Sequence, residues 1–193
     1  MEQLLAAAGI PEAEAIARLL IDSFGSLRGA LTARPSRLHS AIGKGSAALP
    51  FLKLWRQCLL FSQREQLRLP VRCSSEQLVP FLQNRIGQEP IEVAYVILFN
   101  ATGGLLWDGE IARGSFQHCP AEPKEIARKA LEVGAALVVL AHNHPGGDPT
   151  PSTADRTLTR RVSDTCRLVD AVLFDHLVIG AQSVTSFREL GLL

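Results

Sequence analysis

One stretch decides how the C-terminal part of this chain folds: residues 135–155, which read AALVVLAHNHPGGDPTPSTAD. It begins after Gly134 with a short apolar run, and a run of this kind predicts a buried β-strand. The glycines and prolines in its middle predict a loop. From Ser152 the apolar residues return at helical spacing as far as Val169, so the sequence predicts a strand, a loop and a helix in direct succession.

Two histidines and an aspartate stand at the two ends of this loop. His142 and His144 are two residues apart at the end of the strand, and such residues point to the same side. Asp155 lies in the first turn of the helix that is predicted to begin near Ser152. Two neutral imidazole nitrogens and one carboxylate can therefore meet beyond the end of the strand. This set of ligands suits zinc, with a fourth position left open for water.

Parts of this pattern also have simpler interpretations. A His-x-His pair at a strand end can be incidental, and Ser152 with Asp155 is typical of a helix N-cap with an acidic residue near the positive end of the helix dipole. Asp148 could be a further ligand, but aspartate beside glycine and proline more commonly bonds its own backbone in a turn. The joint spacing favours the metal site, because neither a cap nor a core requires two histidines on one face and an aspartate after a long loop.

The string HNHPGGDPTPSTAD at residues 142–155 resembles the JAMM signature of the JAB/MPN metalloprotease domains, and among them the bacterial RadC-like proteins. The resemblance extends from about Pro90 to Leu193 and includes RGS at 113–115, PKE at 123–125 and DHLVIG at 175–180. It implies an α+β fold in which helices flank a mixed β-sheet, similar to the cytidine-deaminase sandwich. It also implies a zinc-dependent metallopeptidase or isopeptidase.

The resemblance also implies a role for each site residue. His142, His144 and Asp155 would bind Zn²⁺. Ser152 would help to stabilise the oxyanion, and Glu92, at the start of a predicted strand, would be the general base. A metal-activated water would then attack the amide bond of an unidentified peptide or isopeptide. Taken alone, Glu92 is a charged residue at the entrance to a strand, with no duty beyond solubility.

Three positions near the signature carry separate predictions. Gly146 stands where RadC-like relatives usually have serine, a loop change that should not touch the metal. Glu122 stands where many of them have histidine, so any role of that histidine is different or absent here. His176 is predicted to pack within a strand or to pair with Asp175.

The composition is that of a globular protein. The chain has 193 residues, enough for one well-buried domain and a small additional one. Its net charge of +1 gives no overall attraction to nucleic acids or membranes. The four cysteines lack paired spacing, which favours reduced thiols and a cytoplasmic protein. Neither a signal peptide nor an apolar run of about twenty residues is evident, so export and membrane spanning are not expected.

Residues 1–69 are predicted to form a small all-α segment. Helical spacing of apolar residues predicts a helix from Pro11 to Phe24, shorter pieces at 26–32 and 35–42, and then a long helix. The turn Gly43-Lys44-Gly45 between two helices resembles a helix-hairpin-helix, whose backbone amides can hold a phosphate. A Gly-x-Gly turn also commonly does no more than end a helix.

This turn supports an alternative function. The chain could be a DNA-associated protein, linked to repair, that binds DNA around Gly43-Lys44-Gly45 and holds a structural zinc. The basic side chains that could line this surface are Lys44, Lys53, Arg56, Arg64 and Arg68. A solvated helix face is the commoner explanation for such charges, and Trp55 is predicted to anchor a core rather than to stack on a base. The open position in the ligand set favours catalysis over a structural zinc.

The helical pattern is broken at Leu69–Ser75, and we predict the domain boundary there. Residues 70–89 are predicted to be a linker and a connecting helix, and residues 90–193 to be the metal-binding domain. Within that domain an antiparallel hairpin is predicted from strands at 92–99 and 105–111. The other predicted elements are a helix from Pro123 to Gly134 and strands at 171–179 and 184–187.

Overall fold

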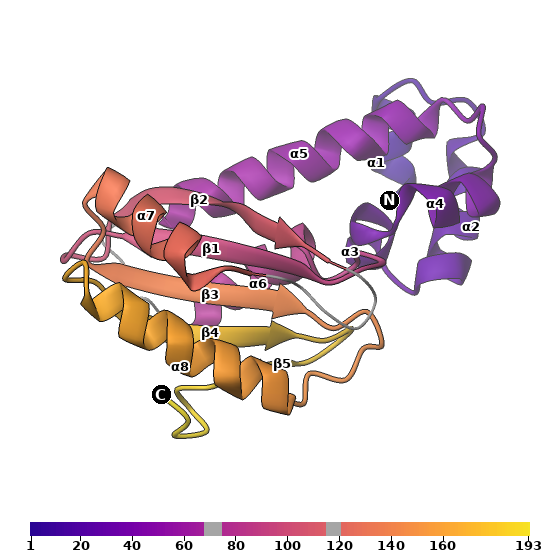
Figure 1. Ribbon diagram of the computed structural model, residues 1–193. Coiled ribbons are helices and arrows are strands. Elements are labelled where there is room, and N and C mark those ends of the chain that lie inside the picture. Colours follow the sequence, from indigo (N-terminus) through magenta and orange to yellow (C-terminus); the bar gives the residue numbers. More distant parts are fainter. Residues whose placement is uncertain (68–74, 115–120) are drawn as a thin grey trace. The chain divides into compact units, whose positions relative to one another are not determined.

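The structure is a computed structural model that describes residues 1–67, 75–114 and 121–193 (Figure 1). The chain divides into two units, Met1–Ser62 and Gln63–Leu193. The domain boundary predicted at residues 69–70 lies outside the described residues.

The first unit is all-helical. It contains α1 (Glu2–Ala7), α2 (Ala13–Phe24), α3 (Leu27–Thr32), α4 (Pro35–Ile42) and the larger part of α5 (Ala48–Leu67). Their apolar faces enclose Leu5, Leu20 and Leu52, each no more than 1% exposed. Trp55 packs against this core, with its ring centroid 5.6 Å from that of Phe51. The helical pattern therefore predicted α2 to α5 correctly, and Trp55 is the core residue that we expected.

The second unit is built on a five-stranded mixed sheet with the order β2-β1-β3-β4-β5. The strands are β1 (Val93–Phe99), β2 (Leu105–Arg113), β3 (Leu137–Asn143), β4 (Val172–Ile179) and β5 (Val184–Ser186). β3 runs antiparallel to β1 and parallel to β4, and each edge strand is antiparallel to its neighbour. The predicted hairpin is β1 with β2, and the apolar run before the signature is the central strand.

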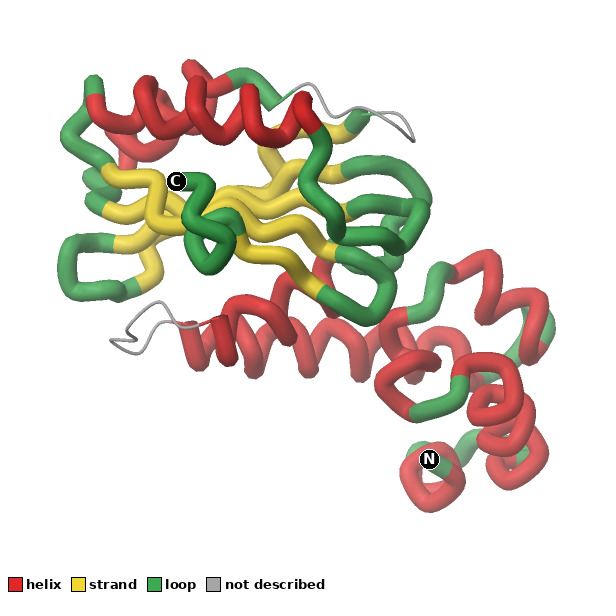
Figure 2. The backbone as a smooth tube through the Cα atoms, turned by 90° about the horizontal axis from the view of Figure 1, so that it is seen from below, coloured by secondary structure: helices red, strands yellow, loops and turns green. Residues whose placement is uncertain are grey.

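Helices cover both faces of this sheet (Figure 2). They are α6 (Ser75–Arg85), α7 (Pro123–Val133) and α8 (Thr153–Arg167). α7 and α8 lie side by side on one face and bury Ile126 and Val162 completely. α6 lies on the other face, where the ring of Phe81 is 6.1 Å from that of Tyr95. Every residue of β1 is buried between these layers. A mixed sheet flanked by helices confirms the predicted α+β class.

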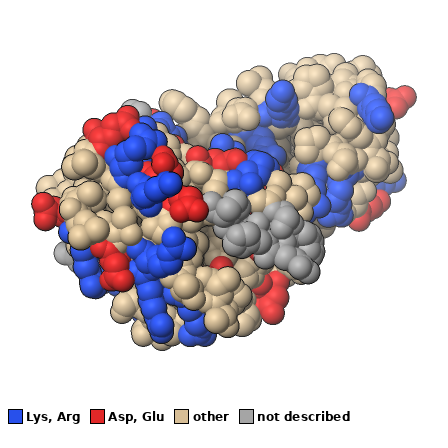
Figure 3. All heavy atoms as spheres, in the orientation of Figure 1, with Lys and Arg blue, Asp and Glu red and all other residues tan. Residues whose placement is uncertain are grey.

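The surface over α7 and α8 carries charges of both signs, as Figure 3 shows. On α7, Arg128 pairs with Glu125 at 3.0 Å and Lys129 with Glu132 at 3.1 Å. Exposed pairs of this kind contribute little to stability. They do keep this face from presenting a single sign of charge. Among the described residues, no helix has the length and apolar character that a membrane span requires.

Candidate metal centre

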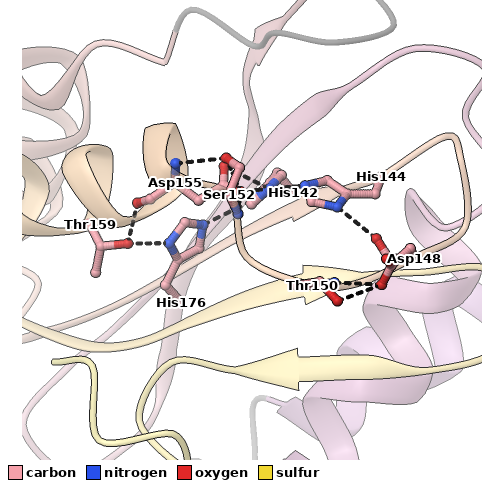
Figure 4. Close-up of polar contacts among 8 residues, drawn as sticks. All are labelled: His142, His144, Asp148, Thr150, Ser152, Asp155, Thr159 and His176. Carbon is pink, nitrogen blue, oxygen red and sulfur yellow. Dashed lines mark hydrogen bonds and ion pairs between the residues drawn. The ribbon is translucent and has the colours of Figure 1, made fainter.

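Three side chains converge at the C-terminal end of the central strand (Figure 4). The Nε2 atoms of His142 and His144 are 3.0 Å apart. The Asp155 carboxylate oxygens lie 3.1 Å from Nε2 of His142 and 3.5 Å from Nε2 of His144. Ligand atoms of a tetrahedral zinc site, with bonds of ~2.0–2.1 Å, are about 3.3 Å apart. The three residues predicted from the sequence therefore fit one zinc-sized ion, and within the described part of the chain they are the group that could hold a metal.

His144 is oriented by the loop that follows it. Its Nδ1 lies 2.7 Å from the backbone oxygen of Asp148. Because a carbonyl oxygen only accepts hydrogen bonds, Nδ1 carries a proton, and Nε2 is the ring nitrogen that faces the site. The Asp148 carboxylate accepts bonds from the hydroxyl and amide of Thr150, which lower its pKa. Asp148 thus braces the loop through its own turn, as predicted, and its backbone rather than its carboxylate serves the site.

His142 has a partner that the sequence did not reveal. Its Nδ1 lies 2.9 Å from Nε2 of His176, which is fully buried. On its other side His176 contacts Thr159 of α8 at 2.7 Å. The prediction that His176 packs within a strand is confirmed, because it lies in β4 and its ring stacks on that of Phe187, with the centroids 4.7 Å apart. The alternative, a pairing of its ring with Asp175, is wrong, because that carboxylate accepts bonds from the backbone amide of His176 and the hydroxyl of Ser186. Burial lowers the pKa of His176 well below its ordinary value, which keeps the ring neutral.

Asp155 is held by the first turn of α8. Ser152 is the N-cap of this helix, and its hydroxyl donates to Oδ2 of Asp155 at 2.7 Å and accepts from the Asp155 amide at 3.1 Å. Burial raises the pKa of Asp155, but the adjacent imidazoles of His142 and His144 and the hydroxyl of Ser152 outweigh it and hold the pKa far below the usual range. The contact with Asp155 in turn raises the pKa of His144 against the effect of partial burial. The same residue, Asp155, therefore completes the helix cap and supplies the candidate carboxylate ligand.

Glu92 lies directly before β1 and is positioned by Asn143, the residue between the two histidines. Asn143 is completely buried, and its Oδ1 accepts from the amide of Val93 at 2.8 Å. Its Nδ2 donates to the backbone oxygens of Glu89 at 3.2 Å and Ile91 at 3.1 Å. One side chain thus ties the segment that carries Glu92 to the strand that carries the ligands.

The variant Asn143→Asp tests this tie. It keeps the acceptor for Val93 but removes the donor to the partly buried carbonyl oxygens of Glu89 and Ile91, so we expect a loss of about 2–4 kcal/mol in the free energy of unfolding, measured by urea denaturation. Asn84→Asp is the matched control, since Asn84 is also buried and bonds Gln63, away from the site. Zinc affinity should change little in either variant. Unchanged stability of Asn143→Asp would mean that the tie contributes nothing.

These residues open onto a pocket of about 360 Å³. Its lining includes Glu92, His142, Ser152 and Asp155, together with Glu122, Thr157, Leu158 and Arg161. The site is therefore accessible to a substrate, and Glu122 faces the same space. At Gly146 a Cβ atom would meet nothing within 4 Å, so exchange of glycine and serine there is sterically free.

The turn that was predicted to bind DNA forms the C-cap of α4. Gly43 adopts φ of 79° and its amide bonds the oxygen of His39. Lys44 and Lys53 line a groove of about 740 Å³. Arg64 was expected on the same side but forms an ion pair with Asp108 in the second unit, and Arg68 lies outside the described residues. DNA binding at this turn stays a prediction.

The chain is similar to proteins of several bacteria. Residues 72–192 match the family model described as the RadC-like JAB domain. A UPF0758 protein of Rhodobacter capsulatus is 38% identical over 179 residues, which are 92% of this chain and 84% of the relative. UPF0758 proteins of Ruegeria pomeroyi and Neisseria meningitidis are 36% and 35% identical over the same length, which is 80% of each relative. The names of these relatives state no activity.

Proposed function

Because the chain belongs to the family of RadC-like JAB domains, we propose that it is a zinc-dependent hydrolase that cleaves the amide bond of a peptide or isopeptide. The observation that carries this proposal is the convergence of His142, His144 and Asp155, whose ligand atoms all lie within 4.8 Å of one another beside an open pocket.

The ligand set supports zinc and catalysis. Two imidazole nitrogens and a carboxylate oxygen suit this ion, and a structural zinc is normally closed by four protein ligands. Here the group has three protein ligands, of which His142 and Asp155 line a pocket, and this supports a fourth position that is open to solvent. When bound, the ion would lower the pKa of a water to about 7 and polarise the substrate carbonyl.

Glu92 is the residue that we assign to proton transfer. It is half-buried, lines the pocket together with His142 and Asp155, and is not a member of the ligand group. Its carboxylate takes a proton from the attacking water and gives it to the leaving nitrogen, which must depart as a neutral amine. Since Asn143 fixes the backbone on either side of Glu92, the carboxylate works from a rigid support.

Ser152 is assigned two roles, the cap of α8 and a donor to the oxyanion, because it lines the pocket beside Asp155. In the second role, its hydroxyl hydrogen would turn from Oδ2 of Asp155 to the oxyanion. We expect Ser152→Ala to lose about 1 kcal/mol of stability through the cap and about a hundredfold in turnover through the missing donor. Ser152→Thr keeps the hydroxyl and should recover most of both. Normal turnover with a lowered melting temperature in the alanine variant would reduce Ser152 to a helix cap.

The proposal is tested with a substrate library, since the substrate is not identified. A proteome-derived mixture of peptides and isopeptide-linked conjugates is incubated with the zinc-loaded protein, and new amino termini are recorded by mass spectrometry. As a control, the same protein is stripped of metal with a chelator and assayed, and it is then reloaded with zinc and assayed again. We expect cleavage that disappears on stripping and returns with zinc. The absence of zinc-dependent products would overturn the proposed activity.

A further inference from the structure

A chain of hydrogen bonds runs from His142 to the backbone of α8 (Figure 4). It passes from Nδ1 of His142 to Nε2 of His176 at 2.9 Å and from Nδ1 of His176 to the Thr159 hydroxyl at 2.7 Å. It ends at the backbone oxygen of Asp155, 2.6 Å from the same hydroxyl. His176 and Thr159 are no more than 1% exposed, so no water competes for these bonds.

The last acceptor fixes the direction of the whole chain. The Asp155 carbonyl can only accept, so the single hydroxyl hydrogen of Thr159 points to it. The Thr159 oxygen must then accept from Nδ1–H of His176. A neutral His176 has its lone pair on Nε2, and this atom accepts from Nδ1–H of His142. It follows that Nε2 of His142 carries no proton and faces the site with a lone pair.

The opposite direction of these hydrogen bonds would hinder metal binding. In the other tautomer of His142, the proton on Nε2 would donate to Oδ1 of Asp155, 3.1 Å away. That bond would join two of the three ligand atoms to each other, so it would compete directly with the binding of an ion. Asp155 alone therefore favours the wrong tautomer of His142, and something else in the structure has to oppose it.

We infer that Thr159 and His176 are positioning residues that hold His142 in the Nδ1–H tautomer before any ion arrives. The Asp148 carbonyl does the same for His144 in one step. Both histidines are thus set by backbone oxygens, and one of these belongs to Asp155, whose side chain is the third ligand. The inference rests on the proposed metal site for its purpose, but the tautomer itself is a property of the metal-free protein.

The test uses Thr159→Val, which removes the hydroxyl and keeps the shape of the side chain. Thr165→Val is the matched control, because Thr165 lies on the same helix and its hydroxyl makes the same bond to the carbonyl four residues earlier, at 2.7 Å, without a histidine partner. Thr159→Ser is the rescue variant. The ring nitrogens of His142 are observed by two-bond ¹H–¹⁵N NMR correlations in the metal-free protein at about pH 8, where free histidine is neutral.

We expect Nδ1–H in the unmodified protein, in Thr165→Val and in Thr159→Ser, and a mixture of tautomers or mainly Nε2–H in Thr159→Val. Zinc affinity, measured by competition with a chromophoric chelator, should fall about ten- to a hundredfold in Thr159→Val alone. A wild-type tautomer and wild-type zinc affinity in Thr159→Val would overturn the inference. If the protein binds zinc but cleaves no amide, the proposed function fails while this result still stands.

Discussion

Replacing His144 with alanine is expected to abolish zinc binding and amide cleavage together. Two of three protein ligands would remain, and the carboxylate of Asp155 would lose the partner 3.5 Å from it. The loss of affinity should exceed the ten- to hundredfold that removal of an outer hydrogen-bond partner costs. His144 suits this test better than His142, because it lies outside the buried chain to His176 and its loss leaves that chain intact.

Zinc content by elemental analysis and affinity by chelator competition measure the effect. His39→Ala is the control, since it removes an imidazole from the first unit without touching the site. We expect one zinc per chain in the unmodified protein and in the control, and none at equal free zinc in His144→Ala. One tightly bound zinc in His144→Ala would show that the ion sits elsewhere.

The elements around this site were predictable because each is bounded by local signals. α7 begins with Pro123 and ends at Gly134 with φ of 67°, and the capping pair of Ser152 and Asp155 starts α8. The alternation along β3 continues one residue past its end, where the His144 amide bonds the oxygen of Ile179, so His142 and His144 are brought together. α1 was not predicted, because its six residues are too few to show a helical period.

The partners of the ligands were not predictable in the same way. His176 meets His142 only because β3 and β4 pair in parallel, with an irregularity in register between Val138 and Val139. Asn143 reaches Val93 across the antiparallel pairing of β3 with β1. Strand order and register depend on the whole sheet, so spacing along the chain carries no signal for either contact. The sequence predicted the candidate ligand set, and the structure adds the hydrogen bonds that orient it.

Glu92→Gln is the second change for which we expect a large effect, and it separates metal binding from chemistry. Glutamine has nearly the same shape and can still bond a water, but it cannot take a proton at neutral pH. Turnover should fall about a hundred- to ten-thousandfold, the range that a positioned general base contributes. Zinc content should stay at that of the unmodified protein, because Glu92 is not one of the ligands.

Glu122 supplies the control for this experiment. It lines the same pocket, is exposed and makes no side-chain capping bond at the start of α7, so Glu122→Gln removes an equal charge from the same space. Turnover is measured on a substrate found in the library, with both variants loaded with zinc. A large loss in Glu122→Gln and none in Glu92→Gln would identify Glu122, the N-cap of α7, as the general base. Equal small losses in both would mean that these carboxylates act through the charge of the pocket, because a proton acceptor has to be one particular group.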